Sequence, residues 1–281
     1  MHNWIWQTWK GKPYLTCDLV AQPHGFFTSA FASQPPESLT AALAANADVL
    51  RTKQVHGNVV LGPADIKAGT RILAASGGLP RLEEDMQRPH ADGCFSDRAD
   101  QATWVCTADC TPALIADQRT GRVAAAHAGW RGTARKIVPI AVAKLQVQGS
   151  RLSDLRVLLG PAIAGEVYQV GEDVAAEISR SIVNPDAFPD DAAVVAHVLA
   201  MEDSPLLPDS KPGHVRLDVR RINQIQLEQL GLSSEQVAIA PHCTYQEPDQ
   251  FFSYRRTKRK QVQWSGIVSI PRQRRGKRIG R

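Results

Sequence analysis

A run of small apolar residues leads into a histidine and a glycine-flanked turn in the segment Ala124-Ala125-Ala126-His127-Ala128-Gly129-Trp130-Arg131-Gly132. The run starting at Val123 has no charge and little bulk, which predicts a tightly packed, buried strand. His127 stands where this strand ends, and such positions often place chemistry on a rigid scaffold. Residues 133–148 then show apolar side chains at helical spacing and stop near Gly149, so a strand–turn–helix unit is predicted.

Two further polar breaks place metal-binding types of side chain between apolar runs. Cys110 separates two strand-like runs, and the second of these, 111–117, is followed by a short turn over 118–121. This spacing predicts a hairpin with the strand that leads to His127. His56, in the run Gln54-Val55-His56-Gly57-Asn58, interrupts apolar residues in the same way. Taken singly, a turn histidine or a core cysteine is the ordinary interpretation of each residue.

Taken together, His56, Cys110 and His127 form a set of nitrogen and sulfur ligands. Catalytic zinc takes three protein ligands of these types and keeps a fourth position open. The same set accepts copper, which binds more tightly than zinc to a given site. The three residues lie far apart in the chain, so their spacing does not by itself indicate a site. Zinc is the first hypothesis, with copper as the alternative.

Other elements follow from apolar spacing and turn residues. Helices are predicted over residues 41–50, 172–181, 192–201 and 218–230, and strands over 154–159 and 238–240. Residues 186–211 hold many prolines and acids and are expected to form an excursion. Neither a repeat nor a composition shift marks a domain boundary.

Several segments resemble the signature segments of the YfiH family of laccase-domain proteins, once labelled polyphenol oxidases. They occur in the family's order from His24 to Arg256, which is most of the chain. The segments are His24-Gly25-Phe26-Phe27-Thr28, Gln54-Val55-His56-Gly57, Ala91-Asp92-Gly93, Thr107-Ala108-Asp109-Cys110-Thr111-Pro112, Ala125-Ala126-His127-Ala128-Gly129-Trp130-Arg131-Gly132, Leu159-Gly160-Pro161-Ala162-Ile163, Tyr168-Gln169-Val170-Gly171, Cys243-Thr244 and Phe251-Phe252-Ser253-Tyr254-Arg255-Arg256.

This resemblance implies an α/β fold, a layered αββα sandwich with mixed sheets in a single compact domain over residues 1–271. It implies a metal held by His56, Cys110 and His127. It also implies purine nucleoside phosphorylase activity on adenosine, inosine and methylthioadenosine, with adenosine deaminase activity. Other members of the family are described as copper-dependent polyphenol oxidases, and some bacterial members as editing hydrolases of peptidoglycan precursors. These two activities are the alternatives.

The chain departs from the family pattern in two places. The residues after Arg256 lack the Gly-rich turn that usually precedes the last strand, although residues 264–270 can supply that strand. Residues 62–89 have no family signal. Substrate contacts are therefore not assigned to either region.

The expected chemistry uses the metal and nearby cations. A bound metal lowers the pKa of water, which supplies a nucleophile for deamination at purine C6. Phosphorolysis brings phosphate to the ribose, and a guanidinium binds phosphate through two hydrogen bonds. The residues assigned to catalysis are Cys110, Asp109 and Arg131, and Asp109 is expected either to orient a metal ligand or to move a proton. The residues assigned to substrate binding are Arg255, Arg256 and Tyr168. A surface ion pair is the alternative role for Arg131, and ordinary packing is the alternative role for Tyr168.

Composition favours a cytoplasmic enzyme. The chain is 43% hydrophobic, enough for a large core, yet no apolar stretch is long enough to span a membrane. Residues 1–10 contain three tryptophans but no signal-peptide pattern. Five cysteines, an odd number at mixed positions, argue against a disulfide framework and fit a reducing compartment. The expected partners are a purine nucleoside and phosphate, and a homodimer is left open.

Positive charge gathers near the end of the chain. Residues 255–281 contain eleven lysines and arginines and no acid, and residues 272–281 are predicted to be a disordered basic tail. No aromatic interleaving or known nucleic-acid motif accompanies these charges, so a solubilising tail is expected rather than a nucleic-acid partner. A third hypothesis combines a structural metal with a tail that docks on an acidic partner.

Overall fold

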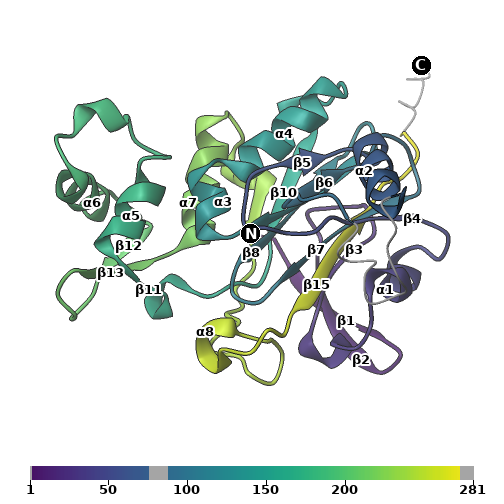
Figure 1. Ribbon diagram of the computed structural model, residues 1–281, viewed down its shortest axis with the longest axis horizontal. Coiled ribbons are helices and arrows are strands. Elements are labelled where there is room, and N and C mark those ends of the chain that lie inside the picture. Colours follow the sequence, from purple (N-terminus) through teal and green to yellow (C-terminus); the bar gives the residue numbers. More distant parts are fainter. Residues whose placement is uncertain (1, 76–87, 273–281) are drawn as a thin grey trace, which may run out of the picture.

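The alanine-rich segment forms strand β9 (Val123–Ala128), which pairs with β8 (Thr111–Asp117) as an antiparallel hairpin. Their register runs from Thr111 opposite Ala128 to Ala116 opposite Val123. The predicted hairpin is thus confirmed. The protein is described here by a computed structural model that covers residues 2–75 and 88–272 (Figure 1).

Two six-stranded mixed sheets contain most of the strands. The first has the order β1 (Trp4–Trp9), β2 (Lys12–Cys17), β3 (His24–Phe27), β15 (Gln263–Val268), β7 (Gln101–Thr107) and β4 (Asp48–Leu50). The second has the order β14 (Val237–Ile239), β10 (Leu155–Leu159), β8, β9, β6 (Gly93–Phe95) and β5 (Val60–Leu61). A smaller sheet has the order β11 (Gln169–Gly171), β13 (His214–Leu217) and β12 (Leu206–Pro208).

The helices cover the outer faces of these sheets. Those of the described residues are α1 (Pro36–Leu43), α2 (Pro63–Ala75), α3 (Trp130–Ala134), α4 (Ile137–Val147), α5 (Glu172–Ser179), α6 (Asp191–Leu199), α7 (Val219–Gln229) and α8 (Tyr254–Thr257). Short 3-10 turns lie at Ser29–Phe31, Leu152–Asp154, Gly165–Val167, Pro185–Ala187 and Ser234–Gln236. None of the described helices is long and apolar enough to cross a membrane.

Alternation along β9 explains why its residues are small. Ala124, Ala126 and Ala128 belong to the core between the second sheet and α4, whereas Val123 and Ala125 belong to the core between the two large sheets. Methyl groups on both faces let α4 and the first sheet approach the strand closely. A third core packs α1 against the outer face of the first sheet. The layers therefore form the predicted αββα sandwich.

The small sheet forms an additional layer with α5 and α6, at one end of the molecule in Figure 1. Its core includes Val170, Val198 and Leu217, and it is joined to the sandwich through residues of α7 such as Ile222. The helices predicted over 172–181, 192–201 and 218–230 correspond to α5, α6 and α7, whereas the strands of this sheet were not predicted.

Two predicted helices differ from the structure. The helix expected over 133–148 is divided into α3 and α4, because Lys136 adopts a left-handed conformation with a φ of 59°. The prediction of a helix over 41–50 is wrong. Helix α1 already begins at Pro36, since proline is well accommodated in the first helical turn, and β4 occupies the end of the predicted range. Of the predicted tail, residues 273–281 lie outside the described residues.

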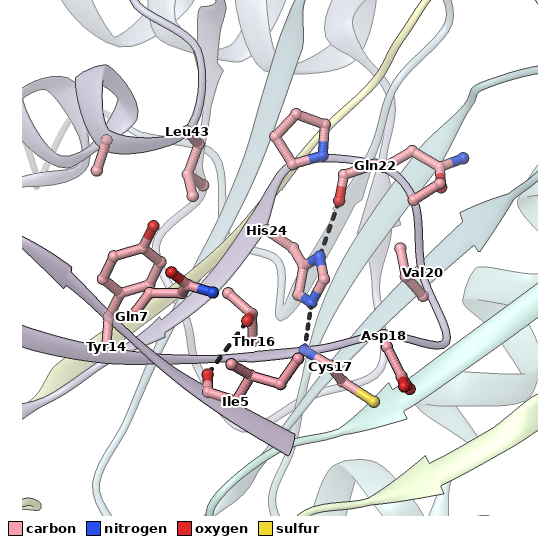
Figure 2. Close-up of a pocket in the computed structure, with 13 residues that line it drawn as sticks. Ile5, Gln7, Tyr14, Thr16, Cys17, Asp18, Val20, Gln22, His24 and Leu43 are labelled. Carbon is pink, nitrogen blue, oxygen red and sulfur yellow. Dashed lines mark hydrogen bonds between the residues drawn. The ribbon is translucent and has the colours of Figure 1, made fainter. Parts of the chain in front are cut away.

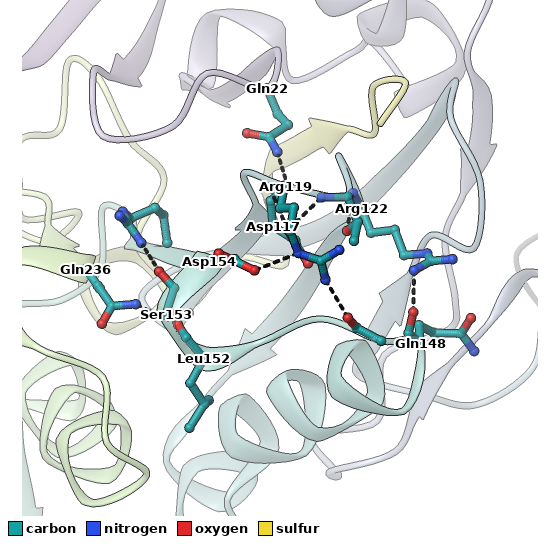
Figure 3. Close-up of polar contacts among 12 residues, drawn as sticks. Gln22, Asp117, Arg119, Arg122, Gln148, Leu152, Ser153, Asp154 and Gln236 are labelled. Carbon is teal, nitrogen blue, oxygen red and sulfur yellow. Dashed lines mark hydrogen bonds and ion pairs between the residues drawn. The ribbon is translucent and has the colours of Figure 1, made fainter. Parts of the chain in front are cut away.

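The turn between β8 and β9 is held by a buried carboxylate (Figure 3). Oδ1 of Asp117 accepts hydrogen bonds from the backbone N–H groups of Arg119 and Thr120, each at 2.8 Å. The Arg119 guanidinium continues to Asp154 at 2.7 Å. This turn lies at the end of the hairpin away from His127.

A surface pocket of about 290 Å³ lies over β1, β2 and β3 (Figure 2). Its lining includes His24, whose Nε2 accepts a hydrogen bond from the Cys17 backbone N–H at 2.9 Å and whose Nδ1 lies 2.8 Å from the Gln22 carbonyl oxygen. The lining residues fall between Ile5 and Leu43. None of the three candidate metal ligands lines this pocket.

Candidate metal centre

The three candidate ligands meet where the chain passes between the large sheets. His56 lies on the connection from β4 to β5, and Cys110 on the connection from β7 to β8. His127 lies near the end of β9, opposite Pro112. Their ligand atoms all lie within 4.8 Å of one another. The structure thus brings together the three residues that were predicted to bind a metal.

The backbone is locally strained at this point. His56 has a φ of 59° and Asp109 a φ of 88°, values that non-glycine residues seldom adopt. The amide of Gln54 ties the first connection to β7, because it donates to the Cys106 carbonyl oxygen and accepts from the Cys106 N–H, each at 2.8 Å. Tertiary contacts therefore hold these unusual conformations in place.

Asp92 holds two of the ligands and was not among the predicted site residues. Its side chain is fully buried next to β6. Oδ1 lies 2.9 Å from Nδ1 of His127, and the carboxylate also accepts the backbone N–H groups of residues 55–57. Because a carboxylate accepts only, Nδ1 of His127 donates and Nε2 is left for a metal. The signal in the sequence was the signature segment Ala91-Asp92-Gly93, to which no role at the site was assigned.

The charges of Cys110 and His127 stabilise each other. Burial alone would raise the pKa of the Cys110 thiol, but the charge of His127 and hydrogen bonds with both histidines lower this pKa to about 6. Burial opposes the charged form of His127 too, but Cys110 and Asp92 raise its pKa to about 9. Near neutral pH the metal-free pair is therefore a thiolate and an imidazolium, and a bound metal would displace the proton from Nε2 of His127. The thiolate is the form of cysteine that binds metals.

The residues fit a zinc ion with an open coordination position. Imidazole nitrogen and thiolate sulfur are both ligands that zinc accepts, and catalytic zinc takes three protein ligands and keeps a fourth position open. Gly129 leaves room for the sulfur, because a Cβ at this position would lie 2.9 Å from Sγ of Cys110. His127 is 3% exposed, whereas His56 is exposed, so one side of the ligand group is open to solvent.

Tyr168 lies among the other predicted site residues. Burial is the main cause that raises the pKa of its hydroxyl to about 12, and the charges of Cys110 and Asp109 add to the increase. The charges of Arg255 and Arg131 act in the opposite direction. Cys110, Asp109, Arg131 and Arg255 thus lie near enough to Tyr168 for their charges to act on its hydroxyl.

Arg255 and Arg131 differ in how they are held. The Arg255 guanidinium lies 4.8 Å from the centre of the Tyr168 ring and donates to the Gln169 carbonyl oxygen at 2.8 Å. It covers one face of that ring, and Tyr168 also packs against the core of the small sheet. Arg131 is exposed, and its guanidinium lies 4.2 Å from the Trp130 ring centre.

The contacts of Asp109 do not support its predicted role of orienting a metal ligand. Its carboxylate accepts the Thr244 hydroxyl at 2.8 Å and the Arg255 backbone N–H at 2.7 Å. Asp92 orients His127 instead, because its carboxylate lies beside Nδ1. Asp109 positions the segment that contains Arg255, and a role as proton carrier stays a prediction.

The contacts of Arg256 favour a structural role over the predicted substrate binding. Its guanidinium donates to the backbone carbonyl oxygens of Thr244, Tyr245 and Phe251 at 2.6–2.7 Å. These bonds close the loop before α8. Of the two neighbouring arginines, Arg255 is therefore the one placed at the site.

Comparisons with known proteins identify relatives of this chain. Purine nucleoside phosphorylase slr1573 of Synechocystis sp. is 51% identical over 267 residues, which cover 95% of this chain and 97% of that protein. Adenosine deaminase RL5, from an unknown prokaryotic organism, is 28% identical over 150 residues, which cover 53% of this chain and 51% of that protein. The crystal structure of YlmD from Geobacillus stearothermophilus has the same fold, with a TM-score of 0.74 at 22% identity over 95% of this chain and 100% of that one.

A family model described as multi-copper polyphenol oxidoreductase laccase matches residues 33–269, a range that includes all three candidate ligands. This match and the 51% identical Synechocystis relative confirm the family resemblance. A second solved structure, Bacillus licheniformis YfiH, has the same fold, with a TM-score of 0.66 at 24% identity over 88% of this chain and 92% of that one. The relatives named above are enzymes of purine nucleosides, although the family description refers to laccases. The chain belongs to this laccase-like YfiH family.

Proposed function

We propose that the protein is a zinc-dependent purine nucleoside phosphorylase that acts on adenosine, inosine and methylthioadenosine and also deaminates adenosine. The observation that carries this proposal is the group of His56, Cys110 and His127, with ligand atoms within 4.8 Å of one another. The charges of Cys110 and of two arginines, Arg131 and Arg255, act on the same side chain, Tyr168. The names of the relatives support the reaction class. A purine nucleoside and phosphate are then the substrates.

In phosphorolysis, a phosphate oxygen forms a bond to ribose C1′ while the bond from C1′ to the purine nitrogen breaks. The bonding electrons leave with the base, which takes up a proton. Arg131 and Arg255 supply the positive charge that phosphate needs, since a guanidinium pairs well with its oxygens. The Tyr168 hydroxyl keeps its proton at neutral pH, because its pKa is about 12, and can donate to an anionic oxygen.

In deamination, water adds to purine C6 and ammonia leaves. Zinc held by His56, Cys110 and His127 would supply Lewis-acid polarisation and would lower the pKa of water. The protein's own contribution is to hold the ligands in place through Asp92 and to leave the His56 side open. Asp109 is the candidate for moving a proton, since it is next to Cys110 in the chain and its charge acts on the Tyr168 hydroxyl.

Copper-dependent oxidation of phenols is the second candidate, because the family description refers to laccases. Within the described residues, the group of His56, Cys110 and His127 is the only cluster of three or more histidine, cysteine, aspartate or glutamate side chains that could hold a metal. Multicopper oxidation needs several copper ions close together. The presence of one three-ligand group among the described residues therefore favours phosphorolysis over copper-dependent oxidation.

The test measures bound metal and the release of base from inosine and adenosine, with and without phosphate. We expect zinc in the purified protein and base release only when phosphate is present. Cys110→Ala should remove both, whereas Cys94→Ala, at a fully buried cysteine elsewhere in the second sheet, should keep both. Zinc-loaded protein without phosphate-dependent turnover would refute the proposal. Oxygen consumption with a phenol, lost in His127→Ala, would support the copper alternative.

A further inference from the structure

We propose that Asp92 is the positioning residue that assembles the metal centre, because its carboxylate couples the orientation of His127 to the backbone turn of His56. The two ligands lie on separate segments, yet both are hydrogen-bonded to the same buried side chain. The inference concerns metal binding and does not depend on which reaction the metal serves.

The contacts of Asp92 divide between its two oxygens. Oδ1 lies 2.9 Å from Nδ1 of His127 and accepts the His56 N–H at 2.8 Å. Oδ2 accepts the Gly57 N–H at 2.7 Å and the Val55 N–H at 3.1 Å. Three consecutive backbone donors thus converge on the carboxylate that also holds the imidazole. Charge-assisted hydrogen bonds of this kind are stronger than neutral ones.

The His56 turn needs this support. His56 has a φ of 59°, a left-handed conformation that is strained for a residue with a side chain. The N–H groups of His56 and Gly57 bond the carboxylate only while the turn keeps this shape. If the carboxylate is lost, the turn is free to relax, and the His56 imidazole then leaves the position that faces Cys110.

The Asp92 backbone is fixed as well, so its side chain has little freedom to adjust. Its carbonyl oxygen accepts the His127 N–H at 2.7 Å, and its own N–H donates to the Val59 carbonyl oxygen at 3.0 Å. Its side chain is 0% exposed, so water cannot replace the carboxylate without a cavity. The residue therefore links β9 to the connection that contains His56.

Asp92→Asn tests this coupling while keeping the size of the side chain. A carboxamide has only one accepting oxygen, and its NH₂ group would face backbone donors. We expect zinc affinity, measured by competition with a chelator on the full chain, to fall about 10- to 100-fold, as is typical when such a partner of a metal ligand is lost. Because the His56 turn relaxes in this variant, adding His56→Ala should cause much less further loss than His56→Ala causes in the wild type.

Asp117→Asn is the matched control. Asp117 is also 0% exposed, and its carboxylate also accepts backbone N–H groups of a turn, at the other end of the hairpin. Its substitution should lower stability but leave zinc affinity unchanged. Wild-type zinc affinity in Asp92→Asn, or losses from Asp92→Asn and His56→Ala that simply add, would overturn the inference.

Nuclear magnetic resonance of the zinc-loaded wild type gives an answer even if the variant does not fold. We expect His127 to carry its proton on Nδ1 and the Gly57 amide to exchange slowly with solvent. A proton on Nε2 of His127, or rapid exchange at Gly57, would contradict the inference. Zinc binding is measured here without nucleoside, so a failure of the proposed phosphorolysis would remain distinguishable.

Discussion

Gly129→Ala is expected to weaken zinc binding without unfolding the protein. Gly129 has a φ of −71° and a ψ of 169°, which alanine adopts without strain, so the backbone tolerates the change. The new Cβ, however, would lie 2.9 Å from Sγ of Cys110, closer than real Cβ contacts come. Normal contact needs about 3.5–4.0 Å, so the sulfur must move by about 0.6–1 Å.

That displacement is several times the tolerance of about 0.2 Å for a metal–ligand distance. It is comparable to losing an outer-shell partner of a ligand, so we expect zinc affinity to fall about 10- to 100-fold. The assay is competition with a chelator, combined with thermal unfolding of the metal-free protein. Gly171→Ala is the control, because Gly171 also precedes a helix with a φ of −68°, and its Cβ would meet only the side chain of exposed Asp173. Wild-type zinc affinity in Gly129→Ala, or an equal loss in Gly171→Ala, would refute the reasoning.

Three further outcomes are expected. The pKa shifts of Cys110 and His127 act in opposite directions on the stability of the metal-free protein: the lowered pKa of Cys110 makes its contribution grow with pH from about 6 towards the ordinary value of 9.0, and the raised pKa of His127 makes its contribution shrink with pH from the ordinary value of 6.5 to about 9. The two effects offset each other, so stability should change little across this range; denaturant unfolding across pH checks this, and a steep slope there would contradict it. Burial lowers the pKa of His24, which accepts the Cys17 N–H, so its contribution should be lost as pH falls below the unfolded value of about 6.5; His24→Gln should remove this acid sensitivity (Figure 2). Arg255→Gln should raise the KM for phosphate about 10- to 100-fold with unchanged zinc content, because a charged hydrogen bond to phosphate is lost. Arg259→Gln, on the exposed surface, should leave this KM unchanged, and equal effects of the two substitutions would argue against a phosphate site at Arg255.

Local patterns in the sequence were enough for the elements nearest the ligands. The run that became β9 is buried along its whole length, and the β8–β9 hairpin has the expected turn. The ligand set itself was assembled through family resemblance, because His56 and His127 are too far apart in the chain for spacing to connect them.

The features that were not predicted from the sequence depend on long-range contacts. Asp92 bonds His127 across 35 residues, and its other partners are backbone N–H groups that leave no pattern of side chains. The small sheet consists of strands of three or four residues, too short to show a clear alternation. Arg255 and Arg256 are adjacent in sequence, and only tertiary contacts distinguish them, since Arg255 is held by Asp109 and Arg256 by backbone carbonyls.

X-ray absorption at the zinc edge, with one equivalent of zinc on the full chain, tests the metal centre most directly. We expect one thiolate sulfur at about 2.3 Å and two imidazole nitrogens at about 2.0–2.1 Å, with a further light atom at the open position. The sulfur contribution should disappear in Cys110→Ala and persist in Cys94→Ala. A wild-type spectrum without sulfur, or one that indicates four protein ligands, would contradict the open site formed by His56, Cys110 and His127.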